Sequence, residues 1–217
     1  MISLWIKSAK EKRHFKRGIF KIISGGQTGV DRGALDAALA LKVECGGWCP
    51  AERFAEDGKI PKHYPVVELK DAGYAERTAR NVADSDGTLV ISNGEPMGGT
   101  RETIDRCVEM GKPHLVIDCA SMIVPEMIEA ATEFVKSLSS RADARDLPVG
   151  QATSGHSLGF SPSPRLGMTA VNVAGPRASQ WPEGHKTAQQ IVSGILGRLV
   201  DRTTPLNTVR HSPRGDP

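Results

Sequence analysis

The stretch that most constrains the fold is residues 21–33, which read KIISGGQTGVDRG. Residues 21–23 predict a short buried strand, and residues 31–41 predict a helix with an apolar face. The turn between them is rich in glycine, which allows positive φ and a close approach of the backbone to a ligand. The glycines concerned are Gly25, Gly26 and Gly29.

The helix that follows this turn would present its free N–H groups and positive dipole end to a ligand, an arrangement that suits a phosphate. Gln27, Thr28 and Asp31 lie at the mouth of the turn. The spacing is neither G-x-G-x-x-G nor G-x-x-x-x-G-K-[ST], so it is not a standard dinucleotide or Walker loop. A ligand-binding loop and a plain tight turn are both compatible with the glycines.

A second strand, glycine turn and helix start follow later in the chain. Residues 88–92 read TLVIS, an apolar β-branched run typical of a central parallel strand. Gly98 and Gly99 follow, and Thr100 is predicted to cap a helix over 100–110. Because two such turns lie at the carboxyl ends of strands in one sheet, they can converge on one anion.

The remaining chain continues the alternation of strand and helix, which predicts an α/β fold: a doubly wound, mostly parallel sheet with helices on both faces. Further strands are expected near 42–47, 66–69, 113–118 and 169–174, and further helices at 74–83, 124–138 and 184–199. The helix at 74–83 is expected to expose a charged face of Glu76, Arg77 and Arg80. Residues 51–65 are polar and interrupted by prolines, so they are predicted to form an irregular, functional loop.

One domain is expected, over residues 19–198, with a basic lead-in at 1–18, an insertion rich in Ser, Gly, Pro and Arg at 139–167, and a tail at 199–217. Residues 1–18 hold six basic side chains and one acidic, a charge of +5, so the net +3 of the chain leaves about −2 for the rest. That balance argues against a nucleic-acid-binding body. No segment is long and apolar enough to span a bilayer.

The four cysteines do not form the disulfide framework of a small secreted domain, which favours reduced thiols and a cytoplasmic protein. Cys45 and Cys49 lack two further ligands for zinc, so no bare-metal site is expected. Trp48 and Trp181 are candidates either to flank the pocket or to close the core.

Four charged side chains are candidates for chemistry at these loops. Glu102 and Asp31 are candidate catalytic acids or bases, although a carboxylate in the first turn of a helix is also stabilised by the dipole. Arg177 follows a strand end and a Gly-Pro turn, a position that suits an anion. Arg32 is either an anion ligand or a solvated helix residue.

Five segments together resemble one family, the molybdenum cofactor carrier proteins, also described as circularly permuted YpsA-like members of the SLOG superfamily. The segments are SGGQTGVDRGA at 24–34, GWCP at 47–50, AEDGKIP at 55–61, GGT at 98–100 and NVAGPRAS at 172–179. The resemblance covers residues 19–198. It implies a Rossmann-like fold, a homo-oligomer and a phosphorylated small-molecule ligand, the molybdenum cofactor or a nucleotide.

The same resemblance implies which residues hold that ligand. The phosphate cradle would be Gly25, Gly26, Gln27, Thr28 and Gly29 with Gly98, Gly99 and Thr100, and the polar rim would be Asp31, Arg32, Arg177 and Ser179. The superfamily also contains phosphoribohydrolases with the signature P-G-G-x-G-T-x-x-E. This chain has PMGGTRE at 96–102 instead, which favours a carrier or storage protein over an enzyme. A phosphoribohydrolase-like enzyme and a nucleotide sensor remain the alternatives.

Overall fold

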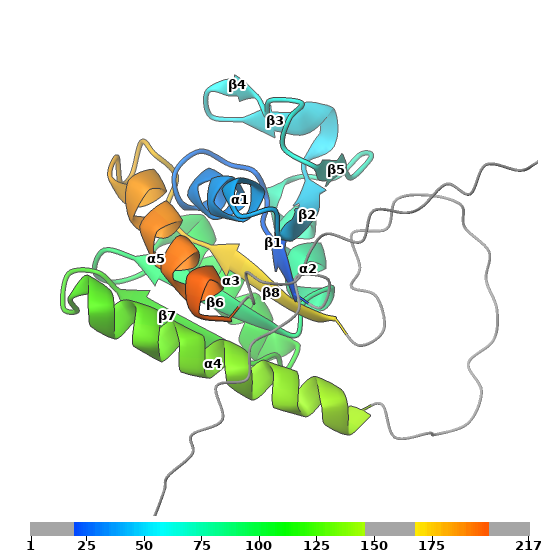
Figure 1. The fold of residues 1–217 in the computed structure, drawn as a ribbon. Helices are drawn as coiled ribbons and strands as arrows, with labels where there is room; N and C mark the ends of the chain where they lie inside the picture. The colour runs from blue at the N-terminus through cyan, green and yellow to red at the C-terminus, as the bar shows by residue number, and fades with distance from the viewer. Residues whose placement is uncertain (1–19, 146–167, 200–217) are drawn as a thin grey trace, which may run out of the picture.

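The computed structural model describes residues 20–145 and 168–199 (Figure 1). Six strands form one sheet in the order β5-β2-β1-β8-β6-β7, and every pairing between them is parallel. The strands are β1 (Phe20–Ile23), β2 (Glu44–Cys49), β5 (Val66–Glu68), β6 (Gly87–Ser92), β7 (His114–Asp118) and β8 (Thr169–Ala174). The predicted parallel, doubly wound sheet is confirmed.

In the described part of the chain, five α-helices cover the two faces of this sheet (Figure 1). They are α1 (Val30–Ala40), α2 (Tyr74–Ala83), α3 (Gly98–Glu109), α4 (Val124–Arg145) and α5 (Gly184–Leu199). On one face α1 packs against α5 and α5 against α4, while on the other face α2 packs against α3. Because both faces are covered, β1 and β6 are buried along their whole length, as their apolar runs predict.

The last strand of the chain lies in the middle of the sheet. β8 pairs with β1 on one side, Ile22 opposite Val171, and with β6 on the other, Leu89 opposite Val173. Since all three strands are parallel, their carboxyl ends meet at one edge of the sheet. The loops that follow them, residues 24–29, 93–97 and 175–183, therefore lie at that same edge.

Three local predictions are wrong. Residues 51–65 are not irregular throughout, because a 3₁₀ turn (Ala51–Arg53) leads into the two-stranded hairpin β3 (Phe54–Ala55) and β4 (Gly58–Lys59). The helix α4 continues to Arg145, seven residues into the predicted insertion. Thr100 is not a cap, because α3 already begins at Gly98 after Met97 and buries Thr100 in its first turn.

The predicted charged face of α2 is only partly exposed. Arg80 has a half-exposed side chain, but the side chain of Arg77 is only 14% exposed because it turns toward a carboxylate of α1. Within residues 20–145 and 168–199, no helix combines the length and apolar character needed to cross a membrane. The lead-in at 1–18, most of the predicted insertion and the tail from 200 lie outside the described residues.

Candidate functional site

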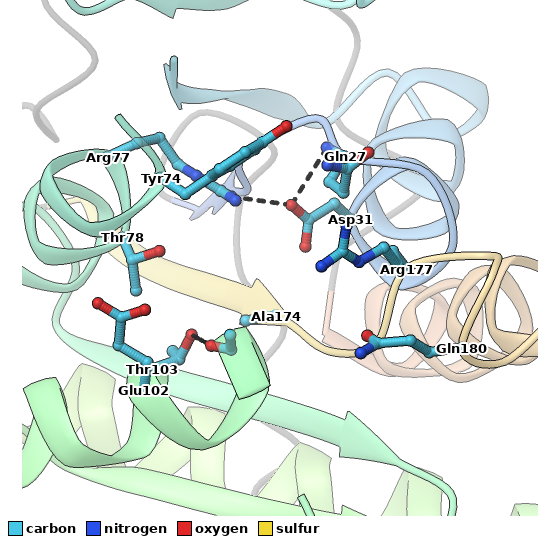
Figure 2. A pocket seen from close by; sticks show the side chains of 11 residues that line it. Gln27, Asp31, Tyr74, Arg77, Thr78, Glu102, Thr103, Ala174, Arg177 and Gln180 are labelled. Carbon is cyan, nitrogen blue, oxygen red and sulfur yellow. Dashed lines mark hydrogen bonds and ion pairs between the residues drawn. The ribbon is translucent and has the colours of Figure 1, made fainter. Parts of the chain in front are cut away.

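A cavity of about 250 Å³ lies where the loops after β1 and β8 meet helices α2 and α3 (Figure 2). We call it the Arg77 cavity. Its lining combines two arginines and two carboxylates with neutral polar groups, and the residues come from four stretches of the chain, 27–31, 74–78, 99–103 and 174–180. The lining residues are Gln27, Asp31, Tyr74, Arg77, Thr78, Gly99, Glu102, Thr103, Ala174, Arg177 and Gln180.

An ion pair between α1 and α2 forms one wall of this cavity. Arg77 Nη1 donates to Asp31 Oδ2 at 3.0 Å, and the backbone N–H of Gln27 donates to the same oxygen at 3.3 Å (Figure 2). Asp31 is only 4% exposed, so burial raises the pKa of its carboxyl, against the opposing effect of the Arg77 guanidinium. The Asp31 carboxylate, in the first turn of α1, thus faces the Arg77 guanidinium of α2 across the glycine turn.

Arg77 lies directly over the first glycine of the turn. A Cβ built on Gly25 would lie 1.4 Å from Arg77 Nη1, so a side chain at this position would displace the guanidinium. Arg77 Nε is buried and has no hydrogen-bond partner among the described residues. A buried donor without an acceptor is costly, and such groups in native proteins call for a specific explanation. Here the guanidinium retains an unused donor at the edge of a cavity.

The other glycines of the first turn serve the packing of one loop on another. Gly26 and Gly29 have φ of 75° and 77°, which only glycine adopts readily. A Cβ on Gly29 would lie 2.5 Å from the carbonyl oxygen of Pro176, in the loop after β8. Gly99 is different, because apart from its chain neighbours and the backbone of its own helix no described atom lies within 4 Å of the position of a Cβ there. Its backbone, in the first turn of α3, is open to the Arg77 cavity.

Glu56, which the sequence did not single out, ties the loops together. Its carboxylate accepts hydrogen bonds from the hydroxyl of Thr28 and from the hydroxyl and N–H of Ser179, and Arg177 Nε lies 3.9 Å away. Burial works to raise the pKa of the Glu56 carboxyl, but the hydrogen bonds from Ser179 and Thr28 and the charge of Arg177 hold that pKa below its ordinary value. The loops after β1 and β8 are therefore joined through a third segment.

That third segment is itself held by one arginine. The guanidinium of Arg53 donates to four backbone carbonyls, at distances from 2.7 to 3.1 Å, and so closes the segment 53–66 on itself. The four carbonyls belong to Ile60, Pro61, Tyr64 and Val66. This explains how a long segment with little regular structure can place Glu56 against two other loops.

Arg32 also supports the first turn. Its side chain is 11% exposed and pairs with both oxygens of Asp57 at 2.6 and 2.8 Å, while its Nε donates to the carbonyl of Gly26 at 3.0 Å. Arg32 holds the pKa of the Asp57 carboxyl below its ordinary value. The guanidinium donors of Arg32 are therefore used in hydrogen bonds to Gly26 and Asp57.

The structure divides the predicted site residues into two groups. Gln27, Asp31, Gly99, Glu102 and Arg177 line the Arg77 cavity, and Gly25 lines a small recess beside it. The others do not line the cavity: Gly26, Thr28, Gly29, Arg32, Gly98, Thr100 and Ser179.

Sequence reasoning missed the contribution of α2. Tyr74, Arg77 and Thr78 all line the cavity, and Thr78 and Asn81 are buried polar residues on the inner face of this helix. Polar residues where a helix faces the core were the available signal, because such a face is ordinarily apolar.

A second cavity, of about 320 Å³, lies between the loops after β6 and β8, and we call it the Trp181 cavity. Gln180 lines both cavities, so the two adjoin. The lining residues are Ser92, Asn93, Glu95, Met97, Pro176, Gln180 and Trp181. Trp48 lies outside both, with its indole N–H donating to Asp84 at 2.7 Å.

A histidine and the four cysteines lie away from the cavities. His185 Nε2 lies 2.8 Å from Asp36 Oδ2, between α5 and α1. The cysteines are free thiols, three of them buried. Among residues 20–145 and 168–199, no three His, Cys, Asp or Glu side chains are grouped so that they could hold a metal ion.

Comparison with known proteins adds two matches. A model of the circularly permutated YpsA SLOG family matches residues 22–150. A crystal structure at 1.45 Å resolution, of a "Putative molybdenum carrier protein" from Syntrophus aciditrophicus SB, is similar with a TM-score of 0.68 and 33% sequence identity, covering 84% of this chain and 98% of that chain. No curated protein matches the chain.

Proposed function

The chain belongs to the circularly permuted YpsA family of SLOG proteins, and from this premise we propose that it is a carrier or storage protein for a phosphate-bearing small molecule. The Arg77 cavity is the proposed site of the phosphate. The candidate ligands are the molybdenum cofactor or molybdopterin, and a nucleotide. Support for the first comes from the similar protein described as a molybdenum carrier.

The observation that carries the proposal is the unused donor of Arg77. A guanidinium presents its donors in a planar fork that matches two phosphate oxygens. Nε of Arg77 is buried without a described acceptor while Nη1 is held by Asp31, so the fork is oriented but incompletely used. A phosphate oxygen in the cavity would supply the missing acceptor.

Two further groups favour an anion at the same place. Arg177 reaches the cavity from the loop after β8, and its side chain is 46% exposed and therefore free to move toward a ligand. The first turn of α3 presents the open backbone of Gly99 at the positive end of a twelve-residue helix. The charges of Asp31 and Glu102 oppose these groups, and the pairing of Asp31 with Arg77 reduces that opposition.

The molybdenum cofactor, as a pterin with a terminal phosphate, fits this arrangement through its phosphate. The cofactor itself would be the cargo, and it would bring the molybdenum chemistry with it. The residues of this chain would bind the phosphate through Arg77, Arg177 and the N-terminus of α3.

The test is isothermal titration calorimetry with molybdopterin and with AMP, combined with native mass spectrometry of gently purified protein. We expect Arg77→Met to weaken binding at least about tenfold, because a charged hydrogen-bonding partner of the phosphate is removed. Arg80→Met is the matched control, since Arg80 lies one turn along α2 with its side chain 52% exposed and outside the cavity. Gly99→Val should also block the site, and equal affinities in all four proteins would contradict the proposal.

A second candidate function rests on the two carboxyls of the Arg77 cavity. Glu102 and Asp31 both line it, and burial raises the pKa of Asp31, so one cavity holds a candidate acid and a candidate base. A phosphoribohydrolase-like enzyme would hydrolyse the N-glycosidic bond of AMP with water and release adenine and ribose 5-phosphate. Chromatography of AMP after incubation tests this, and turnover that disappears in Glu102→Gln while AMP still binds would favour the enzyme.

Cytoplasmic location and a homo-oligomer are part of the same proposal. The free thiols of the four cysteines suit a reducing compartment. The family resemblance supports self-association, and light scattering coupled to size-exclusion chromatography measures the number of subunits.

A further inference from the structure

We propose that the Trp181 cavity binds a flat heteroaromatic ring whose edge carries an amino-pyrimidinone group, as in guanine and pterins. This inference rests on the proposed function, because it assigns the second half of the same ligand. The Arg77 cavity would hold the phosphate and the Trp181 cavity the ring.

One turn of backbone connects the two cavities and fixes their spacing. The N–H groups of Gln180 and Trp181 both donate to the carbonyl of Arg177 at 3.0 Å, and the N–H of Gly184 donates to the carbonyl of Trp181 at 3.0 Å. Arg177 lines the first cavity, Gln180 lines both and Trp181 lines the second. This hydrogen-bonded turn therefore places three groups in sequence order: the Arg177 guanidinium at the Arg77 cavity, the Gln180 amide at both cavities and the Trp181 indole at the Trp181 cavity.

The indole of Trp181 is held in place by the helix that follows. A Cβ on Gly184 would lie 2.8 Å from Cε3 of Trp181, so the absence of a side chain there lets the ring seat against the start of α5. Trp181 is 8% exposed, and Met97 and Pro176 complete the apolar part of the cavity. Aromatic and apolar side chains of this kind form the surface on which a heterocyclic ring stacks.

Among the polar groups of the cavity, two side-chain amides and one indole N–H are neutral and unused. Within the described part of the chain, no hydrogen bond involves the side-chain amides of Asn93 and Gln180 or the indole N–H of Trp181. Amides supply both donors and acceptors, which matches the alternating edge of a heterocyclic ring rather than an anion. The Arg77 cavity, by contrast, is lined by four charged side chains.

Glu95 gives this cavity its expected selectivity. Its carboxylate lines the cavity and is held only at 3.8 Å by Arg101. A carboxylate has two acceptor oxygens and so matches the two neighbouring N–H donors of an amino-pyrimidinone edge. Adenine lacks that pair of donors, so GMP should bind more tightly than AMP.

The experiment is calorimetric titration of the full chain with ribose 5-phosphate, AMP, GMP and 6-hydroxymethylpterin phosphate. We expect GMP and the pterin to bind at least about tenfold more tightly than ribose 5-phosphate. Trp181→Ala and Asn93→Ala should remove that advantage and leave ribose 5-phosphate unchanged, and Glu95→Gln should remove the preference for GMP over AMP. The pterin and GMP arms distinguish the two sources of the ring.

The control variants separate failure of the ring site from misfolding and from failure of the phosphate site. Asn93 is exposed, so its replacement tests the cavity even if Trp181→Ala does not fold, and Trp48→Phe changes an indole outside both cavities. If ribose 5-phosphate binds as tightly as GMP and the pterin, the ring site is refuted while the phosphate site stands. If GMP binding survives Arg77→Met but is lost in Asn93→Ala, the phosphate site fails and the ring site stands. Absence of binding by all four compounds overturns both.

Discussion

At the scale of single residues, the pair of Arg77 and Asp31 is the most consequential contact of the site. Two side chains that are 14% and 6% exposed hold opposite charges 3.0 Å apart. Removing one partner of such a pair leaves an uncompensated buried charge, which destabilises a protein more strongly than the intact pair stabilises it. Arg77 therefore contributes to folding as well as to the proposed binding.

We predict that Arg77→Met lowers the free energy of unfolding by about 3 kcal/mol at pH 7.5. Asp31 would then lose the cation that opposes the effect of burial, so its folded-state pKa would rise further above the ordinary 3.8. An acid with a raised pKa in the folded state costs stability as pH rises, so the deficit should shrink on going to pH 5.0. Urea denaturation at both pH values measures it. Arg80→Met should cost less than about 1 kcal/mol, and equal effects of the two changes would contradict the prediction.

Glu56 affects the pH dependence of stability with the sign opposite to that of Asp31, because the pKa of Glu56 is lowered in the folded state and that of Asp31 is raised. The pKa of Glu56 is held below the ordinary 4.5, so its contribution to stability is complete above that value and is lost as pH falls through the lower folded-state value. We predict that Glu56→Gln is less stable than the native chain by about 1 kcal/mol at pH 7, with the two curves converging as pH falls below 4.5. Thermal unfolding across pH measures the difference. Glu109→Gln, on an exposed face of α3, should follow the native chain throughout, and a Glu56→Gln deficit that persists at low pH would refute the assignment.

At the scale of elements, the close approach of α1 and α5 positions the first glycine turn. A Cβ on Gly33 would lie 2.2 Å from the backbone oxygen of His185 and 3.1 Å from Cβ of Ala188. Backbone cannot retreat as a flexible side chain can, so glycine is required where the helices cross. The start of α1, and with it Asp31, is held at the sheet edge by this contact.

Gly33→Ala is therefore predicted to lower the free energy of unfolding by at least about 2 kcal/mol, because the added methyl forces α5 away from α1. Gly99→Ala is the matched control in a helix of the same sheet edge, where no described atom outside the chain neighbours and the helix's own backbone lies within 4 Å of the new methyl. That change should be neutral or stabilising by up to about 1 kcal/mol. Urea denaturation measures the free energy of unfolding of both variants. Similar values for Gly33→Ala and Gly99→Ala would contradict the prediction, because they would show that α1 and α5 can separate without loss of stability.

The elements themselves could be predicted because most carry a hydrophobic period that depends on local sequence alone. The helices at 74–83 and 184–199 have the predicted bounds. The end of α4 was missed because SSRADAR, residues 139–145, lacks an apolar period although Ala and Arg favour helix. The β3–β4 hairpin was missed because strands of two residues carry no alternation.

The site was harder to predict than the fold, because its groups come from segments far apart in sequence. Glycine turns at strand ends could be recognised, and three of the lining residues, Gln27, Asp31 and Gly99, belong to them. Arg77 could not be distinguished from its neighbour Arg80, since only the packing of α2 on β2 and against α3 decides which of the two is buried. The position of Glu56 depends on the hydrogen bonds by which Arg53 closes residues 53–66 on themselves, and no local sequence pattern reveals them.

At the scale of the whole molecule, the order of the strands along the chain differs from their order in space. β8 and α5 come last, yet β8 lies between β1 and β6 and α5 packs against α1 (Figure 1). In space, β8, α5 and β1 are arranged like a strand, a helix and the neighbouring parallel strand of a doubly wound sheet, although β1 is the first described element and α5 the last. Read from β8 onward, the chain would follow the sheet from its centre to one edge and then cross to the other.

A permuted chain made of residues 168–217 followed by residues 1–167 is therefore predicted to fold into the same sheet. Its strands would pair as before, β8 with β1 and β6, because strand pairing needs adjacency in space and not a particular covalent order. Its melting temperature should lie within about 5 °C of that of the native chain, with the same far-ultraviolet circular dichroism. A control chain opened at Ala131 breaks α4 at a fully buried residue and should melt far lower or fail to fold. If the chain opened at 168 behaved like this control, the covalent link from α4 to β8 would be a determinant of the fold, and the central place of β8 would depend on it.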